Sequence, residues 1–270
     1  MKLDSKIKKD IPLAPLTTFK IGGPAKYYVE INSMNDLIGA YDWAREREQK
    51  VFILAGGSNV LINDKGVNGL VIKLANKNST PKGERIECGA GAELSQVVRL
   101  AISNVLSGLE WATGIPGSLG GAVRGNAGAF GYCMADIVET VEVFDLEKIK
   151  FILLSKNDCR FNYRNSLFKE DKSLIIWQIT LRLKKGNTKD INLLVDKNIN
   201  YRKLAQPKLP SAGCIFKNVF INDLKKANSR FAKLAQEKGI VKEDKVSIGW
   251  LIKEIIEPGK KIGGAKISLE

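Results

Sequence analysis

The stretch TGIPGSLGGAVRGNAGAFG, residues 113–131, is the most informative part of the chain. Its seven glycines are too dense for an ordinary helix or strand. A flexible loop is one interpretation. The Ile115-Pro116 pair and the interleaved Ala and Val residues favour a packed, rigid backbone that closely approaches a flat cofactor. The stretch contains neither GxGxxG nor the Gly-Lys pair of a P-loop, so neither of those nucleotide-binding motifs is present.

A second glycine-rich stretch, GGSNVLI at 56–62, follows directly after a predicted short buried strand at 51–54. Gly56 and Gly57 permit a tight turn with exposed N–H groups, and Ser58 and Asn59 add side-chain donors. Such a concave turn can hold a diphosphate, although a plain β-turn would have the same composition.

Two further segments contain residues suited to chemistry. In FNYRNSLF, 161–168, Arg164 follows Tyr163 and offers a permanently charged donor fork for a carboxylate or enolate; alternatively it is an ordinary surface arginine. In PSAGCIFKN, 210–218, Cys214 follows a small-residue turn at the predicted start of a strand. A thiol is mainly protonated near neutral pH and can donate a proton, but a free cysteine is more often a small buried hydrophobe. Lys217 could meet a phosphate or carboxamide.

The composition excludes several classes of protein. The chain of 270 residues has no histidine, which removes a Ser-His-Asp triad, a His-ligated metal and a flavin tethered through histidine. Its four cysteines are scattered, which predicts a reducing cytoplasm, and neither a signal peptide nor a membrane-spanning run is present. The net charge of +14 suits nucleic acid, nucleotide diphosphates or a merely solvated surface. The basic-aromatic pattern of RNA-binding domains is absent.

Periodicity predicts three units, at 1–76, 77–206 and 207–270. We expect strands at 25–31, 51–54, 69–74, 84–91, 139–145, 149–154, 173–183 and 213–217. We expect helices at 35–48, capped by Ser33, and at 93–104, 189–204, 223–238 and 248–257, with Pro207 and Pro258 following two of them.

Six segments in this order resemble the UDP-N-acetylenolpyruvoylglucosamine reductase family, in its shorter subtype. They are TTFKIGGPA (17–25), GGSNVLI, GLEWATGIPGSLGGAVRGNAGAFG (108–131), FNYRNSLF, QPKLPSAGCIFKN (206–218) and IGWLIKE…IGGAKIS (248–268). The resemblance implies an α+β fold: an FAD-binding fold of the vanillyl-alcohol-oxidase type in two α+β subdomains, plus a small α+β substrate domain.

The resemblance also implies the reaction. NADPH reduces non-covalently bound FAD and leaves; the enolpyruvyl ether of UDP-N-acetylglucosamine then receives hydride at its methylene carbon and a proton at its α-carbon, giving UDP-N-acetylmuramate for the cell wall. Arg164 matches the family's enolate-stabilising arginine and Cys214 its proton donor. The implied partners are these small molecules, with no nucleic acid or membrane, in a cytoplasmic monomer. The implied substrate-binding residues are Tyr163, Arg202 and Lys217, and the implied FAD-binding residues are Gly56, Gly57, Ser58, Asn59, Gly114, Ile115, Pro116, Gly117, Ser118, Gly121, Ala122, Asn126 and Gly128.

Two features depart from the family pattern. Residues 219–246 look like an inserted helical segment. The printed sequence stops at Glu270, before the segment in which the family carries a catalytic glutamate, and Glu270 is not equated with it. Either the gene is truncated or the printed sequence is incomplete, and we expect the printed chain to bind FAD and accept hydride from NADPH but to reduce the substrate poorly. The alternatives are an inactive flavoprotein, another FAD oxidoreductase of the same fold and a basic nucleic-acid-binding protein.

Overall fold

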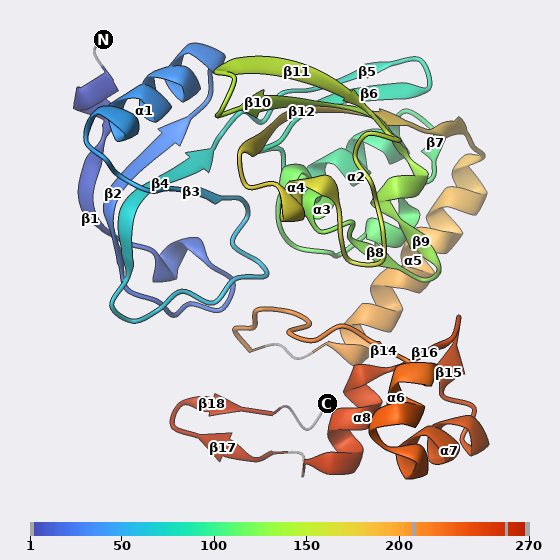
Figure 1. Ribbon diagram of the computed structural model, residues 1–270. Helices are drawn as coiled ribbons and strands as arrows, with labels where there is room; N and C mark the ends of the chain where they lie inside the picture. Colours follow the sequence, from blue (N-terminus) through green and yellow to red (C-terminus); the bar gives the residue numbers. More distant parts are fainter. Residues whose placement is uncertain (1–2, 207–208, 257–258, 268–270) are drawn as a thin grey trace. The chain divides into compact units, whose positions relative to one another are not determined.

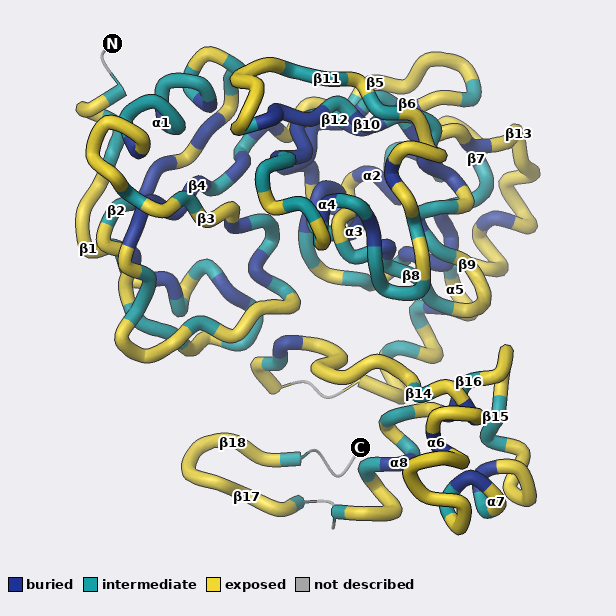
Figure 2. The backbone as a smooth tube through the Cα atoms, viewed as in Figure 1, coloured by how far each residue is buried: buried dark blue, intermediate teal, exposed yellow. Residues whose placement is uncertain are grey.

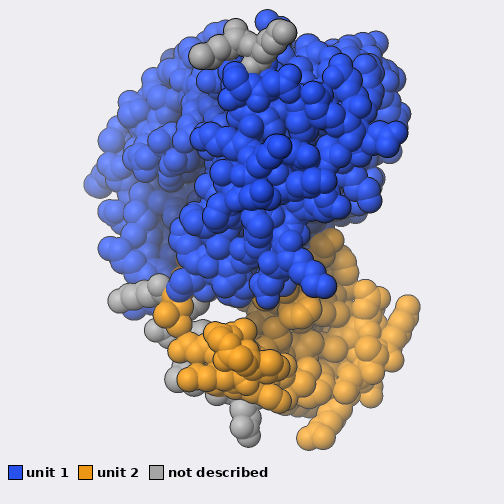
Figure 3. Space-filling view, turned by 90° about the vertical axis from the view of Figure 1, so that its left-hand side faces the viewer, with its two compact units in different colours: residues 1–204, 210–212 blue, residues 205–209, 213–270 orange. Residues whose placement is uncertain are grey.

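The structure is a computed structural model that describes residues 3–206, 209–256 and 259–267. Pro207, Pro258 and Glu270, which enter the sequence predictions, lie outside the described residues. The chain forms two compact units, one of residues 1–204 and 210–212, the other of residues 205–209 and 213–270 (Figure 3).

The first sheet of the larger unit is a β-α-β arrangement extended by one antiparallel strand. Its order is β1-β2-β4-β3, in which β2, β4 and β3 are parallel and β1 is antiparallel to β2. Helix α1 covers one face (Figure 1), and the Ser33 side chain caps it by accepting from the Asp36 N–H, as predicted. The elements are β1 (Lys8–Pro12), β2 (Pro24–Ile31), α1 (Met34–Glu46), β3 (Val51–Leu54) and β4 (Val67–Leu74).

Strand β3 forms where predicted, but the prediction that it is buried is wrong. It is the outer strand of the sheet, and Phe52 and Ile53 are 43% and 40% exposed. A short apolar run predicts a strand but does not say how many neighbours that strand will have.

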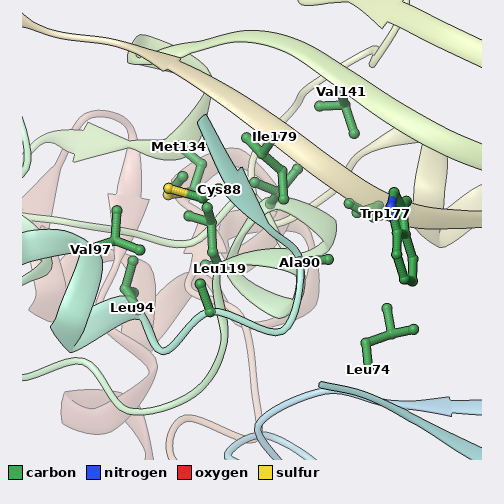
Figure 4. Packing of buried hydrophobic residues seen from close by; sticks show 14 of the residues in the cluster. Leu74, Cys88, Ala90, Leu94, Val97, Leu119, Met134, Val141, Trp177 and Ile179 are labelled. Carbon is green, nitrogen blue, oxygen red and sulfur yellow. The ribbon is translucent and has the colours of Figure 1, made fainter. Parts of the chain in front are cut away.

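The second sheet is antiparallel throughout, in the order β11-β10-β12-β6-β5. Val141 and Val143 of β10 are both fully buried, as their alternation predicts. Helix α2 buries the predicted face, including Leu94 and Val97, which Figure 4 shows in the same interior as Leu119 of α3. The elements are β5 (Ser79–Lys82), β6 (Arg85–Gly89), α2 (Leu94–Ser103), α3 (Leu119–Arg124), β10 (Val138–Asp145), β11 (Lys150–Ser155), α4 (Leu167–Glu170) and β12 (Leu174–Arg182).

Helix α3 contradicts the expectation that the glycine-rich stretch 113–131 is too rich in glycine for a helix. Ser118 caps it, accepting from the Gly121 N–H at 3.3 Å. A Cβ on Gly120 would lie only 2.8 Å from the Cβ of Ala90. The helix therefore needs glycine because it packs directly against β6–α2, and this tertiary packing outweighs the poor helix propensity.

Short elements and one long helix complete the larger unit. The long helix, α5, was predicted from its periodicity, whereas the two-residue strands were not. The elements are η1 (Leu3–Lys6), η2 (Ala14–Leu16), β7 (Leu106–Ser107), η3 (Glu110–Ala112), β8 (Gly128–Ala129), β9 (Tyr132–Cys133), η4 (Met134–Asp136), β13 (Lys184–Lys185) and α5 (Thr188–Ala205).

The smaller unit has its own core, made mainly by the segment 219–246. Two predictions for this unit are wrong. No strand forms at 213–217, and the predicted helix at 223–238 is two helices, because Asn228 ends one and caps the next by accepting from the Phe231 N–H. The elements are β14 (Val219–Phe220), α6 (Ile221–Ala227), α7 (Ser229–Glu237), β15 (Val241–Lys242), β16 (Lys245–Val246), α8 (Ile248–Ile255), β17 (Lys261–Ile262) and β18 (Ala265–Lys266).

Figure 2 shows the buried positions concentrated along the strands and inner helix faces of the larger unit, with few in the smaller one. A search of the described residues for a helix with the length and apolarity to cross a membrane finds none.

A buried asparagine joins the two sheets of the larger unit. The side chain of Asn76, just after β4, donates to the Trp177 carbonyl at 2.6 Å and accepts from the Gly91 N–H at 3.1 Å. Its close neighbours are glycines because a Cβ on Gly89 would lie 1.9 Å from the Asn76 oxygen. The Asn76 amide thus links the two sheets through buried hydrogen bonds, and the close approach of the backbones leaves no room for a side chain at Gly89.

We predict that Asn76→Ala lowers the free energy of unfolding by about 1–3 kcal/mol, since it leaves the Gly91 N–H without its partner, whereas the Trp177 carbonyl still accepts from the Ala90 N–H at 2.8 Å. The measurement is urea unfolding with an unchanged m-value. Asn78→Ala, at an exposed asparagine two residues on, is the control. Equal losses in the two variants would contradict the assignment.

Candidate functional site

The two glycine-rich stretches meet at their backbones. A Cβ on Gly56 would lie 2.5 Å from the Gly117 Cα, and a Cβ on Gly117 would lie 2.5 Å from the Ser58 Oγ. The Ser58 hydroxyl donates to the Pro116 carbonyl at 3.1 Å. The turn after β3 and the turn before α3 therefore form one backbone-lined surface.

The backbone in this surface has the conformation and the donors that a diphosphate requires. Gly57, Gly114 and Gly117 have φ values of 65°, 78° and 114°, which favour glycine. Among the described residues, no hydrogen bond is donated by the N–H groups of Gly57, Ser58 or Gly117. Turns whose N–H groups point outward are natural anion sites, so the donor set fits the diphosphate of a dinucleotide cofactor.

The remaining predicted cofactor residues of this stretch line the same turn and the start of α3. The Ile115 N–H donates to the Ala112 carbonyl at 3.0 Å, which fixes the turn before Pro116. A Cβ on Gly121 would lie 3.2 Å from the Ala55 Cβ, and Ala122 is buried. Backbone close packing, not flexibility, therefore explains this composition.

Arg164 is fixed against the same glycine-rich stretch. Its guanidinium donates to the Gly128 carbonyl at 2.6 Å and to the Asn126 carbonyl at 3.4 Å. Its φ is 51°, an uncommon value for a non-glycine residue, and Lys169 holds its carbonyl at 3.0 Å. The interpretation of Arg164 as an ordinary surface arginine does not account for these constraints.

The Asn126 side chain forms hydrogen bonds with two other loops. It donates to the Asn162 carbonyl at 2.9 Å and accepts from the Ala135 N–H at 3.0 Å. Asn126 is buried with a φ of 42°. Its predicted contact with the cofactor remains a prediction, but its side-chain amide serves to position the Arg164 loop.

Arg202 of α5 lies against the first turn of the stretch. A Cβ on Gly114 would come within 2.9 Å of the Arg202 Cδ, and the guanidinium contacts the Trp111 carbonyl at 3.5 Å and lies 5.5 Å from the Phe130 ring centre. Tyr163 is half-buried, with its ring centre 5.9 Å from the Arg164 guanidinium. Of the three predicted substrate residues, Arg202 thus borders the glycine-rich stretch and Tyr163 lies beside Arg164.

Cys214 and Lys217 belong to the smaller unit and are exposed on irregular chain. The alternative that Cys214 is a small buried hydrophobe is wrong, and so is its predicted position at a strand. Cys88 and Cys159 are the buried ones, and burial raises their thiol pKa values to about 11 and about 12. Cys214 therefore differs from these two in being accessible to a substrate.

Sequence reasoning missed two supporting residues. Thr18 donates through its hydroxyl to the Ser211 carbonyl at 2.7 Å, and the fully buried Ser166 donates to the Arg124 carbonyl at 2.7 Å. Both lie inside quoted motifs, TTFKIGGPA and FNYRNSLF, so their position beside the glycines and Arg164 was the available signal.

Comparisons with known proteins agree with this geometry. The family described as "FAD binding domain" matches residues 25–148. A UDP-N-acetylenolpyruvoylglucosamine reductase from Synechococcus sp. (strain JA-3-3Ab) is 36% identical, over 99% of this chain and 78% of that protein. The corresponding reductase from Solibacter usitatus is 32% identical, over 97% of this chain and 82% of that protein.

A solved structure extends the comparison to three dimensions. The UDP-N-acetylenolpyruvylglucosamine reductase from Thermus caldophilus matches with a TM-score of 0.77 and 33% identity, covering 98% of this chain and 85% of that one. The predicted FAD-binding fold and the α+β class are thereby confirmed. The backbone surface of the two glycine-rich turns is the part of this chain that fits an FAD diphosphate, and the protein is an FAD-containing oxidoreductase that belongs to the UDP-N-acetylenolpyruvoylglucosamine reductase family.

Proposed function

We propose that this protein reduces the enolpyruvyl ether of UDP-N-acetylglucosamine to UDP-N-acetylmuramate, with NADPH as hydride donor, in peptidoglycan precursor synthesis. Family membership supports FAD-dependent reduction of this substrate. The single structural observation that carries the proposal is the fixed guanidinium of Arg164 beside the glycine-rich stretch that also forms the diphosphate surface. The net charge of +14 favours anionic small molecules as partners.

The cofactor would be held by the backbone of Gly57–Asn59 and of 114–122. Bound FAD supplies a ring that accepts hydride from NADPH and passes it to the substrate's methylene carbon. The protein contributes the N–H donors, the orientation of the ring and the exclusion of side-chain bulk from both turns. The absence of histidine excludes a histidyl tether, and the proposal is that binding is non-covalent.

Arg164 would stabilise the charge that develops on the substrate. Two of its five N–H donors are directed at the carbonyls of Gly128 and Asn126, which fixes the plane of the fork. The remaining donors, which meet no acceptor among the described residues, would face the carboxylate and the enolate oxygen formed after hydride addition. A fork fixed before the reaction need not reorganise during it.

Cys214 would complete the reduction by protonating the α-carbon, after which the thiolate regains a proton from solvent. The overall balance is substrate plus NADPH plus one proton to product plus NADP⁺. Arg202 and Lys217 would bind the substrate's anionic groups and Tyr163 would donate from its hydroxyl. We further propose that the protein acts as a monomer in the cytoplasm, with no nucleic-acid partner.

We predict that Gly57→Ala loses most of its bound FAD, because the new Cβ would lie 2.1 Å from the Leu16 oxygen. Gly83→Ala is the control: its φ of 62° is equally strained, at about 1–2 kcal/mol, but nothing lies within 4 Å of the new Cβ. Absorbance of the purified variants and chromatography of the heat-denatured supernatant measure free FAD. Flavin that stays attached to the wild-type chain after heat denaturation would refute non-covalent binding. Equal loss of FAD in the two variants would refute the assignment of Gly57 to the FAD site.

We predict that Arg164→Ala leaves flavin reduction by NADPH intact but slows reoxidation by the enolpyruvyl substrate by about 10²–10³. The reason is that its charge is needed only where the enolate develops. Stopped-flow traces of the two half-reactions test this, with Arg160→Ala, an exposed arginine four residues earlier, as control. Equal losses in both half-reactions would assign Arg164 to binding or folding. Failure of the wild type to reoxidise with this substrate would indicate an FAD oxidoreductase for a different anion.

We predict that Cys214→Ser retains turnover, since a hydroxyl can also donate the proton, whereas Cys214→Ala slows the protonation step. The alanine variant should accumulate or release the enolate before product forms, and solvent then protonates the released enolate on both faces, which a mixture of configurations at the product's α-carbon detects. Normal turnover by Cys214→Ala would exclude Cys214 as the donor.

A further inference from the structure

Residues 210–212 stay with the larger unit although the chain on both sides of them, 205–209 and 213–270, belongs to the smaller one. These three residues can belong to the larger unit only if contacts with that unit hold them there. The contacts come from Thr18 and Asn59, which lie in two motifs that precede this segment by more than a hundred residues.

Thr18 clamps Ser211 from two sides. Its hydroxyl donates to the Ser211 carbonyl at 2.7 Å, and its own carbonyl accepts from the Ser211 N–H at 3.2 Å. The hydroxyl also lies 3.4 Å from the Ser58 carbonyl, but it has a single proton, and the shorter contact takes it. The Thr18 N–H donates to the Gly57 carbonyl at 3.0 Å, so the clamp is attached to the diphosphate turn itself.

Asn59 holds the next residue. Its side-chain amide donates to the Ala212 carbonyl at 2.6 Å, and Ala212 is buried. The amide that sequence reasoning assigned to the cofactor is thus engaged with the protein's own backbone. Two hydrogen bonds thus join Ser211 to Thr18, and one joins Ala212 to Asn59 of the turn 56–59.

Cys214 is two residues beyond Ala212, so chain geometry keeps their Cα atoms within about 7 Å of each other. We propose that Thr18 and Asn59 are positioning residues that hold the segment 210–212 on the diphosphate turn and thereby set where the thiol of Cys214 can reach. This inference rests on the proposed function for its consequence in catalysis, but the clamp itself can be measured independently of activity.

Thr18 offers the cleaner test, because Asn59 is also a predicted cofactor residue. Thr18→Val removes the hydroxyl and keeps the shape and both backbone hydrogen bonds, while Thr18→Ser restores the donor. Thr17→Val is the control: Thr17 is buried, and its hydroxyl donates to the Ala14 carbonyl at 3.1 Å and accepts from the Lys20 N–H at 3.0 Å, so this variant loses hydrogen bonds in the same loop but none to Ser211.

The first measurement is hydrogen exchange of peptides containing Ser211 in the FAD-loaded protein. We expect Thr18→Val to speed exchange about fivefold, as loss of one hydrogen bond implies, and Thr18→Ser and Thr17→Val to match the wild type. Unchanged exchange in Thr18→Val would overturn the clamp, whether or not the protein reduces the proposed substrate.

The second measurement separates positioning from a purely structural role. Thr18→Val should keep its FAD and its rate of reduction by NADPH, and lose about tenfold in reoxidation by the enolpyruvyl substrate, with Thr18→Ser restored. A wild-type rate of reoxidation, or equal losses in both half-reactions, would overturn the positioning role. If the wild-type protein does not reduce the enolpyruvyl substrate, the proposed function is wrong. The hydrogen-exchange measurement alone then decides whether Thr18 holds Ser211.

Discussion

The contact between the backbone of residues 56–58 and that of residues 116–118 is the constraint on which the rest of the larger unit depends. A side chain at Gly56 or Gly117 would collide with the opposite turn, so these two positions require glycine. The first turn ends a strand of the parallel sheet and the second begins α3, which packs on the antiparallel sheet. Fixing this contact therefore fixes both sheets together, with the buried Asn76 amide as a second connection.

The chemistry of the site follows from the same segment. Left-handed backbone at Asn126 and Arg164 allows the Arg164 side chain to fold back on the carbonyls of the glycine-rich stretch. Such conformations persist only where the surroundings determine them, here through the Asn126 amide, Ser166 and Lys169. The segment that presents N–H donors to an anionic cofactor thus also presents carbonyls that orient a cation, so cofactor binding and charge stabilisation share one rigid support.

Much of the fold could be predicted from the sequence, because periodicity and caps are local. The Ser33 cap, the buried face of α2 and the strands of both sheets formed as expected, except for the outer strands β1 and β5, which were not predicted. What could not be predicted depends on tertiary neighbours. The helix at Leu119–Arg124 forms because Gly120 packs directly against Ala90, and β3 is exposed because it is the outer strand of its sheet. The division into two helices at Asn228 could have been predicted, since asparagine often caps helices. The helical spacing of apolar residues continues across Asn228, however, and favoured a single helix. For the site, the sequence identified the motifs, but only the structure shows that the Asn59 amide donates to the Ala212 carbonyl.

The segment 219–246, which looks like an insertion in the sequence, is integral to the smaller unit. Ile221 and Leu224 of α6 and Ala232 and Ala235 of α7 form its core together with Val246 and with Leu251 of α8. Helix α8 lies in the motif IGWLIKE, which this chain has in common with the family pattern. The segment therefore provides the apolar partners that a short amphipathic helix cannot supply for itself, since helices of this length owe their stability to packing. In this chain the motif at 248–254 is stabilised by the apolar residues of the segment 219–246.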